Sequence, residues 1–107
     1  MKYLLVVNTN DPETIWNSLR LGSAALGRDH KVDMFLLGPG VEIEIAQDQR
    51  FDIQEQLTRF MELGGTAHSC GTCLKSRQID AAESCPISTM NDLVRLSEEA
   101  DKVLTFG

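Results

Sequence analysis

The sequence lacks the features that mark several large classes of protein. No apolar run approaches the roughly 18 residues that a membrane-spanning helix requires. The opening segment MKYLLVVNTND contains only a short apolar stretch and no small-residue cleavage site, so it does not predict a signal peptide. A P-loop, a G-x-S-x-G motif and a dinucleotide-binding G-x-G-x-x-G motif are all missing, which leaves phosphate-loop, hydrolase and nicotinamide functions without support. We therefore expect a cytoplasmic protein that does not bind a membrane.

Positive charge is also scarce. The 107 residues include 10 lysines and arginines against 16 aspartates and glutamates, a formal net charge of -6. Nucleic-acid binding normally needs basic residues clustered against the phosphate backbone, so we expect no nucleic-acid partner. The length suits one domain over 1–107, and the apolar content of 42% is ordinary for a globular chain.

Cysteines number only three, an odd count that cannot pair completely within one chain. In a reducing compartment they should be thiols, and a Cys-x-x-Cys motif there is more often reactive or metal-binding than structural. Cys70 and Cys73 form such a motif within HSCGTCLKSR (68–77), whereas Cys85 stands apart. The main question is therefore what the Cys70/Cys73 pair does.

Apolar patterning predicts strands that alternate with helices. Helices should begin at the N-caps Asp11, Asp52 and either Ser88 or Thr89, where Asp92 would complete a capping box with Thr89. The alternation predicts an α/β fold, a three-layer α/β/α sandwich around a mainly parallel sheet. The expected strands cover 2–8, 32–37, 66–69 and 102–106.

Each expected helix has an apolar face, and one intervening segment is ambiguous. VEIEIA (41–46) alternates with period two, which fits either an edge strand or a short helix. The acids from Glu42 to Glu55 are interpreted as a solvated face. The residues expected to point inward are Ile15, Leu19, Gly22 and Leu26, then Ile53, Leu57, Phe60 and Met61, then Met90, Leu93, Val94 and Ser97.

The cysteine pair should lie at the edge of the sheet where chemistry collects. In open α/β sheets that edge is formed by the carboxyl ends of the strands, so Asn8-Thr9, Gly38–Gly40 and Cys70 should meet there. If a helix covers 71–78, its N-terminus favours a thiolate on Cys70, and Cys73 falls one turn later on a similar face. This arrangement fits a redox pair or a thiolate that holds a transferred sulfur atom.

Two further interpretations compete with a reactive pair. A buried cysteine is often only a small core hydrophobe, and this applies best to Cys85, which precedes a proline. Zinc could be bound by four residues with the order H-x-C-x2-C-x11-C, but the second well-formed ligand pair of a structural site is missing. We therefore expect no resident metal or cofactor. The four possible zinc ligands in this pattern are His68, Cys70, Cys73 and Cys85.

Four segments resemble the DsrE/DsrF-like sulfur-relay family, and its YchN-like branch in particular. They are the opening KYLLVVN, FDIQEQL (51–57), CGTCLKSRQI (70–79) and the closing ADKVLTF (100–106), so the resemblance spans essentially the whole chain. It implies an α/β sandwich assembled as homotrimers or hexamers, with sulfur donor and acceptor proteins as partners. It also implies that Cys70 accepts sulfane sulfur as a persulfide, while the role of Cys73 is less settled and Cys85 has no assigned role.

The leading hypothesis is a sulfur carrier or sulfurtransferase subunit that relays sulfur through Cys70. Loading should then be abolished by Cys70→Ser and preserved by Cys73→Ser. The alternative is an oligomeric interaction protein that uses the Cys70/Cys73 pair as a redox sensor without a persulfide. A dithiol oxidoreductase is less favoured, because no tryptophan precedes Cys70 and no proline-bearing loop is evident opposite it.

Overall fold

One five-stranded sheet organises the chain, and every pair of neighbouring strands in it is parallel. The computed structural model describes residues 1–107. The strand order is β4-β3-β2-β1-β5. The elements are β1 (Lys2–Val7), α1 (Pro12–Gly27), β2 (Lys31–Leu36), the 3-10 helix η1 (Gly38–Ile45), α2 (Ile53–Glu62), β3 (Thr66–Cys70), α3 (Gly71–Ser76), β4 (Ile87–Ser88), α4 (Met90–Glu99) and β5 (Lys102–Phe106).

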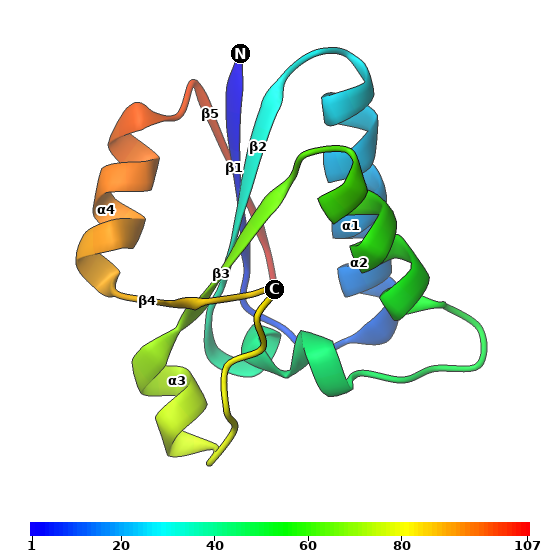
Figure 1. The fold of residues 1–107 in the computed structure, drawn as a ribbon, viewed down its shortest axis with the longest axis vertical. Helices are drawn as coiled ribbons and strands as arrows, with labels where there is room; N and C mark the ends of the chain where they lie inside the picture. The colour runs from blue at the N-terminus through cyan, green and yellow to red at the C-terminus, as the bar shows by residue number, and fades with distance from the viewer.

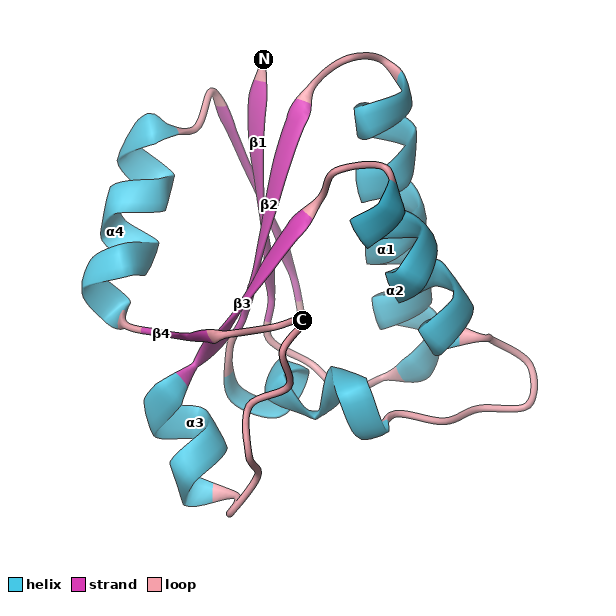
Figure 2. Ribbon diagram, viewed as in Figure 1, coloured by secondary structure: helices cyan, strands magenta, loops and turns pink.

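The helices lie in two layers because the chain reverses its direction across the sheet. From β1 to β4 it advances toward one edge, and β5 then returns to the far side of β1. Right-handed crossovers that run in opposite directions place their helices on opposite faces. Figures 1 and 2 accordingly show α1 and α2 on one face and α4 alone on the other, while α3 lies beyond the end of the sheet. The predicted three-layer α/β/α sandwich is confirmed.

Side-chain caps fix the starts of the three longer helices. Asp11 accepts a hydrogen bond from the Thr14 N–H, and Asp52 accepts one from the Glu55 N–H. Thr89 and Asp92 form a reciprocal capping box at the start of α4. All three predicted helix starts are confirmed, with Thr89 rather than Ser88 as the last cap.

Phe60 joins α1 and α2 over one face of the sheet. Its ring is fully buried and fits against two glycines. A Cβ at Gly22 would lie 2.8 Å from the Phe60 Cε1 atom, and a Cβ at Gly65 would overlap the same ring. The two helices approach closely because Gly22 of α1 leaves room for the Phe60 ring, and Gly65 leaves room for the same ring just before β3. The inward faces predicted for α1 and α2 are confirmed, with Leu26 and Met61 half-buried at their margins.

The predicted inward face of α4 is wrong in three of its four positions. Met90 is 54% exposed, Val94 is 56% exposed and Ser97 is also exposed. The helix instead buries Leu96 and half-buries Leu93. Leu93 belongs both to the predicted stripe and to the stripe that also contains Leu96. These two stripes lie a fraction of a turn apart and are almost equally apolar in this short helix. The spacing of apolar residues therefore did not decide which side of α4 faces the sheet.

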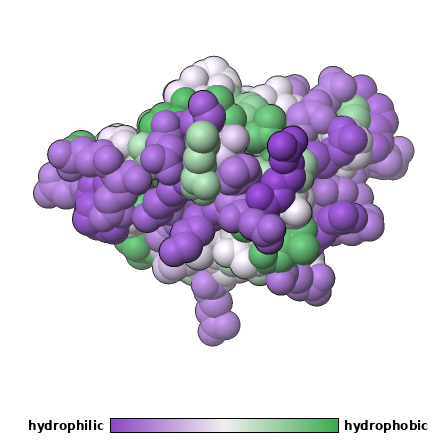
Figure 3. All heavy atoms as spheres, turned by 90° about the horizontal axis from the view of Figure 1, so that it is seen from above, coloured by the Kyte–Doolittle hydropathy of each residue, from purple (hydrophilic) through white to green (hydrophobic).

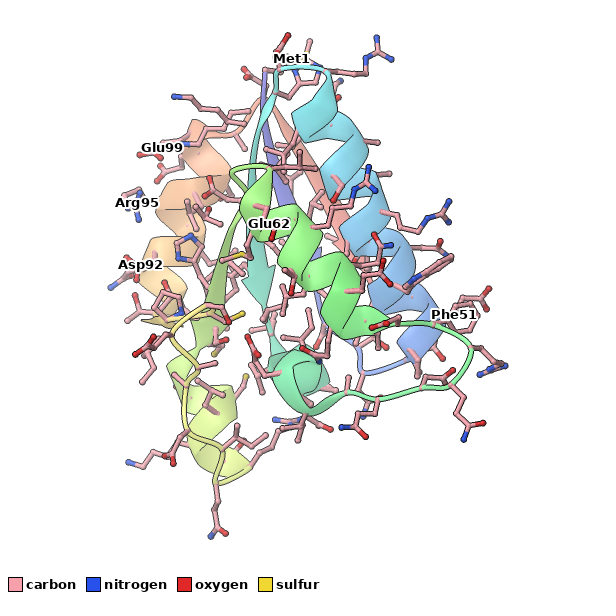
Figure 4. All side chains as sticks on the ribbon, turned by 45° about the vertical axis from the view of Figure 1, so that its right-hand side comes forward. Met1, Phe51, Glu62, Asp92, Arg95 and Glu99 are labelled. Atoms are coloured by element: carbon pink, nitrogen blue, oxygen red, sulfur yellow. The ribbon has the colours of Figure 1, made fainter.

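The outer side of α4 is charged. Arg95 forms ion pairs with Asp92 at 3.7 Å and with Glu99 at 3.4 Å, and Figure 4 shows these three labelled side chains on the outer side of the helix.

The amino ends of the strands lie at the top of Figure 1, and the view from above in Figure 3 shows mostly hydrophilic residues there. No helix of the chain has the length and apolar character needed to cross a membrane.

Other differences from the sequence prediction concern short elements. Residues 41–45 belong to η1 and Ala46 caps it, so the helical alternative holds there. The helix expected over 71–78 ends at Ser76. Strand β4 was not predicted, because two residues are too few to show a period.

Candidate thiol site

Three strand ends meet at the carboxyl edge of the sheet, as predicted. Asn8 follows β1, Gly38 begins η1 close after β2, and Cys70 ends β3. Gly38 has a φ of +53°, and a Cβ there would overlap the Asn8 side-chain oxygen. Glycine at 38 therefore allows both the left-handed turn and the close packing of the first two loops.

Cys70 and Cys73 lie together at this edge. Cys70 is the N-cap residue of α3 and is only 2% exposed, whereas Cys73 lies within α3 and is half-buried. The Cys70 side chain lies near enough to Cys73 to raise the pKa of the Cys73 thiol. The Gly38 N–H donates a hydrogen bond to the Cys73 sulfur at 3.2 Å. All three cysteines are free, so the two thiols are adjacent and reduced.

Opposing effects act on the charge of Cys73. Burial raises the pKa of its thiol, and the nearby Cys70 side chain raises it further. The Gly38 N–H and the Arg77 guanidinium lower this pKa, because both stabilise a negative sulfur. Arg77 donates to the Cys73 carbonyl oxygen at 3.3 Å and to the Glu42 carboxylate at 3.2 Å. At rest, the net effect favours the neutral thiol on Cys73.

Cys85 occupies a different environment. It is 1% exposed and donates a hydrogen bond to the Glu44 carboxylate at 3.4 Å, while the Ser84 hydroxyl donates to the same carboxylate. Burial, followed by the negative charge of Glu44, raises the pKa of Cys85 to about 12. This cysteine stays protonated at neutral pH and acts as a hydrogen-bond donor in the core.

The four residues weighed as zinc ligands do not form a metal site. His68 faces Asp33, with 3.6 Å between the imidazole Nε2 and a carboxylate oxygen, and the Thr66 hydroxyl donates to that same oxygen. Cys85 is bonded to Glu44. No group of three or more histidine, cysteine, aspartate or glutamate side chains is arranged to hold a metal ion.

Two acids of η1 were wrongly interpreted as a solvated face. Glu42 pairs with Arg77, and Glu44 accepts from both Ser84 and Cys85. The two glutamates therefore bind both ends of the 77–86 segment that follows α3. The sequence of η1 contains no signal for these contacts, because both partners lie in a distant segment.

The family follows from a match along nearly the whole chain. The model of the DsrE/DsrF-like family matches residues 1–106. The chain belongs to this family. It is 31% identical to the uncharacterized protein MJ0989 of Methanocaldococcus jannaschii, and the match covers 99% of this chain and 100% of that protein.

Solved structures agree with the family and with the predicted branch. The crystal structure of the ychN protein from E. coli superposes with a TM-score of 0.84 at 26% identity, covering 99% of this chain and 100% of that one. The resemblance to the YchN-like branch is thereby confirmed. BT1422 from Bacteroides thetaiotaomicron, described as a conserved protein of unknown function, shares the fold with a TM-score of 0.71 at 16% identity, covering 97% of this chain and 93% of that one.

Proposed function

We propose that this member of the DsrE/DsrF-like family is a sulfur carrier that holds sulfane sulfur as a persulfide on Cys70 and relays it to a partner protein. The family is associated with sulfur relay. The observation that carries the proposal is the reduced thiol pair at the edge where three strand ends meet. Active sites of open α/β sheets form at this edge.

The chemistry requires only thiol exchange. A donor persulfide gives up its terminal sulfur, so that its own sulfur–sulfur bond breaks and the donor leaves as a thiolate. The sulfur then forms a new sulfur–sulfur bond at Cys70. An acceptor thiolate later attacks the terminal sulfur, and the Cys70 thiolate leaves.

Intact-mass spectrometry after incubation with inorganic polysulfide tests the proposal. The wild type should gain one sulfur atom that survives desalting and is removed by reductant. Cys70→Ser should lose this stable gain, whereas the matched control Cys85→Ser should keep it, because Cys85 is bonded to Glu44 instead. Equal stable loading of wild type and Cys70→Ser would refute the assignment of the carrier to Cys70.

A second function is favoured by the closeness of the Cys70 and Cys73 side chains at this edge of the sheet. Oxidation of this pair to a disulfide would make the protein a redox sensor that carries no persulfide. The same mass measurement distinguishes the two functions, because a disulfide removes two hydrogen atoms and adds no sulfur. A change of assembly with oxidation would support the sensor.

We also propose that the chain assembles as a homotrimer or homohexamer through the side of the sheet that carries α4. Large apolar side chains are exposed in its last elements: Ile87 at 66%, Met90 at 54%, Val94 at 56% and Val103 at 45%. Exposed apolar surface of this kind commonly marks a contact between proteins. Sedimentation equilibrium should show an oligomer, and Val94→Glu should shift it toward the monomer. A monomeric wild type would contradict the proposal.

A further inference from the structure

The two thiols differ in their access to a donor. Attack on a sulfane sulfur requires the nucleophilic sulfur to reach bonding distance, in line with the bond that breaks. Cys70 is 2% exposed, so a donor carried on a protein or on glutathione reaches its sulfur less readily than it reaches the half-buried Cys73. The Cys73 side chain lies near Cys70. A donor therefore meets Cys73 first.

We propose that Cys73 is the entry point for sulfur and that it passes the sulfur to Cys70. This inference rests on the proposed sulfur-carrier function and adds a route to it. In the first step the Cys73 thiolate attacks the terminal sulfur of a donor persulfide, the donor's sulfur–sulfur bond breaks, and the donor leaves as a thiol after taking up a proton. Cys73 is then a persulfide.

The second step takes place within the pair. The Cys70 thiolate attacks the terminal sulfur of the Cys73 persulfide, the bond from that sulfur to Cys73 breaks, and Cys73 leaves with the electron pair. The proton lost by Cys70 returns Cys73 to its thiol. Sulfur moves as a neutral atom between thiolates in both steps, so no external oxidant or reductant is consumed.

Two groups beside Cys73 offset part of the burial that disfavours its thiolate, the form that attacks in the first step and leaves in the second. The Gly38 N–H points at this sulfur from 3.2 Å, and Arg77 is tied to the carbonyl of the same residue at 3.3 Å. A backbone donor and a nearby cation both stabilise a thiolate, as the attacking group in the first step and as the leaving group in the second. Glu42 bonds the Arg77 Nε and so fixes the direction of the guanidinium.

Cys85 provides the matched control because its surroundings have the opposite character. Its thiol donates to Glu44, an acceptor that destabilises a thiolate. A cysteine held in this way neither attacks a donor nor leaves as an anion near neutral pH. Replacing it with serine should leave the route through Cys73 unchanged.

The test is a quenched time course with glutathione persulfide as donor, read by intact mass and by mapping of the alkylated peptides. Wild type and Cys85→Ser should load Cys70 at the same rate. Cys73→Ser should reach the same final loading about tenfold or more slowly, because direct loading of Cys70 must then replace the route; this factor corresponds to about 1.4 kcal/mol or more in activation free energy. Cys70→Ser should show a short-lived persulfide on Cys73 that does not survive desalting.

Arg77→Gln leaves both thiols in place and tests the same route if the Cys73→Ser variant does not fold. It should slow loading and raise the pH at which loading becomes fast, and Arg77→Lys should restore part of the rate. If Cys73→Ser loads as fast as wild type, entry through Cys73 is wrong but the carrier function stands. If no variant and no wild-type sample acquires sulfur at any time, the carrier function itself is wrong.

Discussion

The buried Cys85 thiol should make the stability of the fold sensitive to alkaline pH. Its pKa is about 12 in the folded protein, against an ordinary value of 9.0. A raised thiol pKa means that the folded state favours the protonated form, so this stabilisation is complete below about pH 9 and is lost as the pH rises toward 12. At roughly 1.4 kcal/mol for each pH unit, the loss amounts to at most about 4 kcal/mol.

Chemical denaturation in steps from pH 7 to 11.5, with reductant present, measures this loss. The reference is Cys85→Ala, which lacks the titrating group, so the difference between the two free energies of unfolding isolates Cys85 from tyrosine and lysine titration. This difference should shrink steadily above pH 9. Glu44→Gln removes the charge but not the burial, and burial is the larger cause of the shift, so the variant should retain most of the decline. Parallel curves for wild type and Cys85→Ala would refute the reasoning.

Two further predictions concern packing and acid stability. Phe60→Ala should lower the free energy of unfolding by about 3–5 kcal/mol. Gly65→Ala should destabilise the wild type much more than the Phe60→Ala background, because the Cβ added at position 65 overlaps the Phe60 ring. Additive effects of the two substitutions in a double-mutant cycle would contradict this contact. The pKa of Asp33 is lowered, first by His68 and then by the Thr66 hydroxyl, after allowance for burial. Asp33→Asn should therefore be less stable than wild type above about pH 4, and denaturation curves should converge as the pH falls below this value.

Local chemistry allowed much of the fold to be predicted. Asp11, Asp52 and Thr89 cap helices through bonds to residues three positions along the chain, so the signal lies within one turn. The approach of Asn8, Gly38 and Cys70 followed from a topological rule, because parallel strands place all their carboxyl ends at one edge. These predictions needed no knowledge of which side chains pack together.

Contacts between distant segments were not predictable in the same way. Glu42 and Glu44 bind partners 35 and 40 residues away, and nothing in VEIEIA names those partners. The burial of Cys70 depends on how β3, α3 and the following segment close over one sulfur atom, so spacing indicated the pair but not the difference in exposure between its members. The outward position of Val94 depends on a rotation of α4 that its own pattern does not specify.

The last strand has a protective role that follows from its place in the sheet. β5 pairs only with β1, and β1 is the segment KYLLVV, with Leu4, Leu5 and Val7 buried. A chain cut before residue 102 would leave β1 as a free edge rich in β-branched and aliphatic side chains, which is a template for pairing with other chains. Proteolytic removal of residues 102–107 should therefore promote aggregation through this exposed edge of β1.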